Sequence, residues 1–132
     1  MVLKQVTWGL NDYIFDGQTT NKGLIAQVTT TPRLKMYAGT FVADNDNLVV
    51  NTWGIMRVLF NGESSFIKIN GTAATTGDPG DNDMGGLTLA ANGNAGSNYG
   101  NIQVKEIILR KIADTAPNEA IIYAYLSDKY SI

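Results

Sequence analysis

The chain of 132 residues has no cysteine and no histidine. Without cysteine it can form neither a disulfide bond nor a thiolate metal site, and it has no thiol nucleophile. Without histidine it lacks the commonest general base and the commonest zinc ligand. A domain of this length can form a hydrophobic core without disulfide bonds, so the composition remains compatible with a secreted origin.

Charge of one sign and long apolar runs are also scarce. Ten basic residues against twelve acidic residues give a net charge of −2, and the basic residues are spread along the chain. The chain therefore lacks the basic patch that binds nucleic acid or an anionic membrane. No segment supplies the roughly 20 apolar residues that a transmembrane helix needs, and residues 1–6 contain no long apolar signal segment. We expect one domain over residues 1–132, with no nucleic-acid or membrane partner.

Short apolar segments alternate with turn residues at regular spacing, which is typical of a β-sandwich or barrel. The pattern predicts strands over residues 3–8, 12–15, 24–29, 34–38, 53–60, 65–69, 87–91 and 102–109. The pair Asn61-Gly62 predicts a hairpin, because both residues tolerate a positive φ. The polar, glycine-rich residues 75–86 are expected to form an exposed loop.

The last part of the chain predicts one amphipathic helix over residues 116–130. Thr115 stands at the N-cap position, Pro117 lies in the first turn and Lys129 lies near the end of the helix. Each residue type suits its position, because helix starts favour capping hydroxyls and proline, and helix ends favour cations. The expected apolar stripe consists of Ile122, Tyr125, Leu126 and Lys129.

This stripe needs a surface to cover. The preceding strand contains three consecutive apolar residues, Ile107, Ile108 and Leu109. Such a run is typical of a strand that is buried on both faces. We therefore expect the opposite sheet to cover one face of the strand and the helix to cover the other.

The order of several segments is more specific than any one of them. They are Asn51-Thr52-Trp53, Phe60-Asn61-Gly62, Ile67-Lys68-Ile69-Asn70-Gly71, residues 87–92, the Gly/Asn-rich run 93–101, residues 104–109 and the closing helix. This order resembles the concanavalin A-like, laminin-G-like jelly-roll domains of secreted and phage structural proteins. The resemblance covers residues 12–132. It implies an all-β concanavalin A-like jelly-roll β-sandwich with one C-terminal α-helix, forming a single laminin-G-like domain over residues 1–132.

The sequence differs from the family pattern at the N-terminus. Family members usually carry further strands before the element that corresponds to Asp16-Gly17. Either residues 3–8 replace them, or the sandwich lacks strands and leaves an edge open. Open edges are normally paired or covered, so we expect a homo-oligomer. An extracellular or virion location follows from the resemblance.

Carboxylate chemistry is poorly supported. Jelly-roll glycosidases use two carboxylates on one strand, about 5 Å apart in the retaining mechanism. The three glutamates, Glu63, Glu106 and Glu119, have no second carboxylate at i+2 or i+4 on a strand. A serine nucleophile would lack a histidine to activate it. We expect no enzymatic activity.

Two acidic runs supply the oxygen ligands that calcium prefers. These runs are Asp44-Asn45-Asp46-Asn47 and residues 78–83, and the better candidates for metal ligands are Asp78, Asp81 and Asp83. Asp and Asn are also the commonest turn formers, and neither run matches an EF-hand loop. The cofactor is therefore expected to be none, or calcium, and solvated turns are the favoured interpretation.

One aromatic residue stands in a polar loop. Tyr99 is flanked by Asn98 and lies a few residues after Asn94, without apolar neighbours. Sugar binding typically combines an exposed ring with a few convergent polar groups. Tyr99 is thus either a plug over the sandwich end or a ligand contact, with Asn98 and Asn94 as its polar partners. Trp53 is expected to be structural.

These observations favour a non-catalytic binding module, carbohydrate-binding and lectin-like, in a secreted or virion protein. The alternative is a phage-type structural protein, such as a tail component, that self-associates without a small-molecule ligand. A hydrolase is disfavoured by the missing carboxylate pair and the missing histidine.

Overall fold

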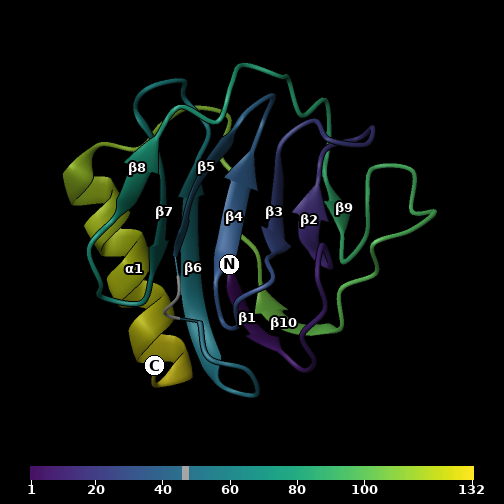
Figure 1. Ribbon diagram of the computed structural model, residues 1–132. Coiled ribbons are helices and arrows are strands. Elements are labelled where there is room, and N and C mark those ends of the chain that lie inside the picture. Colours follow the sequence, from purple (N-terminus) through teal and green to yellow (C-terminus); the bar gives the residue numbers. More distant parts are fainter. Residues whose placement is uncertain (46–47) are drawn as a thin grey trace.

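The computed structural model describes residues 1–45 and 48–132. In these residues the chain forms ten strands followed by one helix (Figure 1). The elements are β1 (Val2–Gln5), β2 (Tyr13–Asp16), β3 (Leu24–Gln27), β4 (Leu34–Tyr37), β5 (Phe41–Asn45), β6 (Trp53–Leu59), β7 (Ser65–Ile69), β8 (Thr75–Gly77), β9 (Thr88–Leu89), β10 (Ile102–Glu106) and α1 (Ala116–Tyr130).

The strands form two antiparallel sheets. Sheet 1 has the order β10-β1-β6-β7-β8, and sheet 2 has the order β5-β4-β3-β2-β9. In Figure 1, α1 lies on the side away from β2 and β9, and it contacts β6 and β7. The expected all-β architecture with a single C-terminal helix is confirmed at this level.

The main core lies between the two sheets. Leu3 and Met56 of sheet 1 pack with Ile25 and Met36 of sheet 2, and each of these side chains is at most 2% exposed. Successive side chains of a strand point to opposite faces of the sheet. Every second residue of these strands therefore enters the core, and the intervening residues face outward.

On sheet 1 the outward face is covered by α1. Val2 and Ile55, the strand neighbours of Leu3 and Met56, form a second cluster with Leu126 of the helix. All three are at most 1% exposed, and Trp53 packs against them as a half-buried residue. The helix thus rests on β1 and β6.

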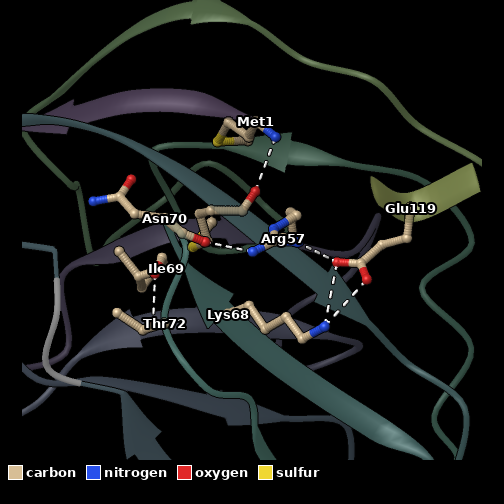
Figure 2. A network of polar contacts seen from close by, with 8 residues as sticks. Met1, Arg57, Lys68, Ile69, Asn70, Thr72 and Glu119 are labelled. Carbon is tan, nitrogen blue, oxygen red and sulfur yellow. Dashed lines mark hydrogen bonds and ion pairs between the residues drawn. The ribbon is translucent and has the colours of Figure 1, made fainter. Parts of the chain in front are cut away.

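A polar network fixes the start of α1 on the same face. The carboxylate of Glu119 accepts hydrogen bonds from Arg57 on β6 and from Lys68 on β7, and Figure 2 shows it between the two basic side chains. The Lys68 Nζ to Glu119 Oε2 distance is 3.1 Å. The Arg57 guanidinium also donates to the Asn70 carbonyl oxygen and lies 4.2 Å from the ring centre of Tyr123.

Two expectations about this region are wrong. β10 ends at Glu106, and Ile107 and Ile108 are only half-buried, whereas Leu109 is 68% exposed. The strand stops there because its neighbour β1 starts opposite Glu106, at Val2, so later residues have no strand to pair with. Tyr125 was expected in the buried stripe of the helix, yet it is 46% exposed.

Two short strands escaped the sequence pattern. β5 follows β4 directly, and β8 lies inside the polar segment 75–86, where a loop alone was expected. β8 is three residues long and pairs with β7 at the edge of sheet 1. None of its three residues is buried, so β8 shows no apolar alternation.

The local turn predictions hold with changes in detail. β6 and β7 form the expected antiparallel hairpin, but only Gly62 has a positive φ, of 53°. The connection is longer than a two-residue turn, since Leu59 pairs with Phe66.

Thr115 is the N-cap residue of α1, although its side chain makes no capping bond. No helix in the described part of the chain is long and apolar enough to cross a membrane.

Candidate ligand-binding site

The outward face of sheet 2, unlike that of sheet 1, has no helix over it. Leu24 and Ala26 lie on either side of the core residue Ile25, so they point away from the core. Together with Tyr13 they form a small buried cluster on this outer face, against which Tyr37 packs. This cluster is the apolar floor of the site described below.

A depression of about 290 Å³ lies over this floor. It is lined by Asn11, Tyr13, Asn21, Leu24, Lys35, Tyr37, Phe41 and Asn98. Strands β2 to β5 supply the aromatic and apolar residues and Lys35, and the neighbouring loops supply the three asparagines. We call it the amide–aromatic depression.

Two rings form one wall. The centres of the Tyr37 and Phe41 rings are 4.8 Å apart and the rings are tilted by 50°. Phe41 is 64% exposed, so most of its ring is accessible to a ligand. Lys35 Nζ lies 4.4 Å from the centre of the Phe41 ring, which is close enough for a cation–π contact.

The three asparagines line the same depression as the rings, and each side chain makes at least one hydrogen bond. Asn11 Oδ1 accepts a 2.7 Å hydrogen bond from Lys35 Nζ, and Asn98 Nδ2 donates to the Asn11 carbonyl oxygen at 2.9 Å. Asn21 Oδ1 accepts a 2.9 Å bond from the Tyr13 hydroxyl. Among the described residues, no partner occupies the Nδ2 donors of Asn11 and Asn21. These donors are available to a ligand.

The asparagines also have a structural reason for their positions. Asn11, Asn21 and Asn98 have φ angles of 62°, 64° and 57°. Asparagine adopts this left-handed conformation more readily than most residues. The same backbone turns therefore bring three amide side chains to one rim of the amide–aromatic depression.

Burial changes the acidity of two groups in the site. It lowers the pKa of Lys35, because the ammonium loses part of its hydration. It raises the pKa of Tyr13, and the negative charge of Asp16 adds to this effect. Both shifts follow from placing polar groups against the apolar floor.

A buried carboxylate organises the loops that carry the asparagines. Asp16 is fully buried, and its Oδ1 accepts hydrogen bonds from the backbone N–H groups of Gly17 and Lys22 at 2.8 and 3.0 Å. Its Oδ2 accepts from the N–H groups of Asn21 and Gly93 at 2.8 and 3.0 Å. The family resemblance singled out Asp16-Gly17, but the sequence did not reveal this supporting role.

The expected ligand residues separate in the structure. Asn98 lines the amide–aromatic depression. Tyr99 pairs with Tyr13 through a backbone bridge, is 62% exposed, and donates its hydroxyl to the Ala95 carbonyl oxygen at 3.0 Å. Neither Tyr99 nor the exposed Asn94 is among the lining residues. Sequence reasoning missed Lys35 of β4 and Phe41 of β5.

The acidic residues proposed for calcium form turns of their own. Asp78 Oδ1 accepts from the N–H of Gly80, and Asp83 Oδ1 accepts from the N–H of Gly85, at 2.8 and 2.9 Å. Asp81 is exposed. In the described ranges, no three acidic side chains gather as a metal site would require. Calcium binding by these residues stays a prediction, and Asp46 of the other acidic run lies outside the described residues.

Two of the glutamates are held by basic or aromatic partners. Glu106 accepts bonds from Lys129 and Tyr130, which lower its pKa. Glu119 pairs with Arg57 and Lys68. These contacts join α1 to sheet 1.

Comparisons with known proteins were made at three levels. No protein-family model, no curated protein and no solved structure matches the chain.

Proposed function

We propose that this chain is a non-catalytic carbohydrate-binding module of a secreted or virion protein, and that the amide–aromatic depression holds the sugar. The observation that carries the proposal is that the exposed ring of Phe41 lines the same depression as Asn11, Asn21 and Asn98. The scaffold in this proposal is the concanavalin A-like jelly roll that the sequence resembles.

The chemistry of a sugar ring matches this arrangement. One face of a pyranose carries C–H groups that pack on an aromatic ring, and its edge carries hydroxyls that need donors and acceptors. Phe41 and Tyr37 supply the rings, and the free Nδ2 groups of Asn11 and Asn21 supply donors. The volume of about 290 Å³ is at the lower limit of small-molecule sites, which span roughly 300–1,000 Å³, so the depression suits a single sugar unit.

A glycan array followed by titration calorimetry tests the proposal. We expect a defined set of glycans to bind, and we expect Phe41→Ala to weaken binding about fivefold to tenfold, which corresponds to about 1 kcal/mol of lost aromatic packing. Ile112→Ala is the matched control, because Ile112 is 79% exposed and lies between β10 and α1. An array without hits, or equal affinity in the Phe41→Ala variant, contradicts the proposal.

A second candidate function is assembly, as in a phage-type structural protein that forms a homo-oligomer. Four large apolar side chains near α1 are exposed, namely Leu109, Ile112, Ile121 and Tyr125. Such side chains are candidates for a contact between copies. Size-exclusion chromatography with light scattering should then give an oligomer that Ile121→Asp dissociates, and a monomer at high protein concentration contradicts this candidate.

A further inference from the structure

Among the described residues that line the amide–aromatic depression, Lys35 alone carries a charge. It lies on β4 between Leu34 and Met36, both of which are fully buried in the core. The backbone of Lys35 is therefore fixed, and strand alternation directs its side chain to the outer face. The position of the ammonium results from the packing of sheet 2.

The ammonium has no anionic partner among the described side chains. Its one hydrogen bond goes to the neutral Oδ1 of Asn11, and its other close neighbour is the Phe41 ring, 4.4 Å away. An ammonium has three donors, so two remain for a ligand or water. The carboxylate of Asp16, beneath the loops that carry the asparagines, accepts four backbone N–H groups and is fully buried.

The cost of this arrangement is the lost hydration of a cation. Burial lowers the pKa of Lys35, and no charge interaction offsets that effect. An ammonium and an anion attract each other through their opposite charges in addition to the hydrogen bond, and this attraction is stronger in a partly desolvated place than in bulk water. An anion at this point would therefore gain more from Lys35 than a hydroxyl would.

We propose that the saccharide bound in the amide–aromatic depression is acidic, with a carboxylate or sulfate that accepts hydrogen bonds from Lys35 Nζ while a sugar ring packs on Phe41. This inference rests on the proposed carbohydrate-binding function and specifies the class of ligand. The asparagine amides recognise the hydroxyls, and Lys35 selects the charge.

The test compares an acidic glycan with a neutral one of the same shape. Calorimetry is performed with an oligogalacturonate and with its methyl ester, and separately with a sulfated galactan oligosaccharide and its desulfated form. We expect at least one acidic form to bind about tenfold or more tightly than its neutral counterpart, since bonds between charged groups contribute more. This preference should weaken with added salt. If the galacturonate pair shows the preference, the recognised group is a carboxylate. If the galactan pair shows it, the recognised group is a sulfate.

Variants of Lys35 connect the preference to this residue. Lys35→Met keeps the apolar stem and should abolish the preference, whereas Lys35→Arg should keep most of it. Lys111→Met is the control, because it removes the same charge from an exposed residue between β10 and α1. Thermal unfolding of each variant shows that it is folded before binding is measured.

The outcomes separate the two proposals. If array-selected neutral glycans bind and neither acidic form binds more tightly, the inference about charge is rejected and the carbohydrate site stands. If a preference exists but survives in Lys35→Met, the assignment to Lys35 is rejected. If no acidic or neutral glycan binds, the inference and the proposed function both fail.

Discussion

Glu119, in the first turn of α1, forms an ion pair with Arg57 in the middle of β6. The two residues are 62 positions apart in the chain, and their side chains are 21% and 14% exposed. The pair therefore joins the closing helix to sheet 1 in a largely water-excluded place. Removal of this ion pair should therefore lower the free energy of unfolding of the whole domain.

We expect Glu119→Gln to lower the free energy of unfolding by about 1–3 kcal/mol, because Arg57 would lose its charged partner and remain half-buried. Urea denaturation measures the change. Glu63→Gln removes an exposed carboxylate beside the β6–β7 hairpin and serves as the control. Equal stability of the two variants would refute this role of Glu119.

Leu126→Ala should destabilise the protein by about 2–5 kcal/mol, since it leaves a cavity between α1 and sheet 1. Leu126 is 1% exposed and packs against Val2 and Ile55. Ile121→Ala on the same helix is the comparison, because Ile121 is 66% exposed and its truncation should change stability by less than about 0.5 kcal/mol. A small effect of Leu126→Ala in chemical denaturation would mean that the helix is not packed as described.

Asp16→Asn should disorder the loops at the rim of the amide–aromatic depression. Both carboxylate oxygens accept backbone N–H groups, whereas an asparagine would present an NH₂ group to two of these donors. The expected loss of stability is about 2–3 kcal/mol. Hydrogen exchange should become faster at Asn21 and Gly93, and Asp81→Asn, at an exposed position, should leave it unchanged.

The amine of Met1 should make stability depend on pH near neutrality. Burial lowers its pKa from 8.0 to about 6. Smaller effects come from the charge of Glu106, which raises the pKa, and from the charge of Arg57, which lowers it. The unfolded chain therefore binds this proton more tightly than the folded protein does, and stability falls as the pH drops from about 8 to about 6. Two pKa units correspond to about 2–3 kcal/mol.

The measurement is urea denaturation at about pH 5.5 and pH 8.5, with and without acetylation of the Met1 amine. Histidine and cysteine are absent, so no side chain ordinarily titrates in this interval. The acetylated protein should lose most of the difference. A pH dependence that is the same in both forms would show that the amine is not its source.

Local signals in the sequence were sufficient for most individual elements. The helix begins and ends where Pro117 and Lys129 predicted, at Ala116 and Tyr130, and β7 has the predicted bounds. These features depend on neighbours within a few residues, and so the sequence carries them directly. The spacing of apolar segments and turns indicated a β-sandwich or a barrel, and the structure has two sheets.

The tertiary structure decided where elements stop and which faces are covered. β10 ends at Glu106 because the neighbouring strand begins at Val2. The apolar residues 107–109 give no indication of where that neighbouring strand begins. Tyr125 is half-exposed because α1 turns Leu126 toward β1 and β6. Both outcomes depend on residues far away in the chain.

The candidate site shows the same division. The loop that holds Asn98 stood out in the sequence, because a polar, glycine-rich run is visible locally. Lys35 and Phe41 did not, because alternation along a strand shows two faces without showing which one the opposite sheet will cover. The sequence by itself determined most of the elements and their turns. The packing of sheet 1 against one face of sheet 2 decided that Lys35, Phe41 and three asparagines would meet on the other.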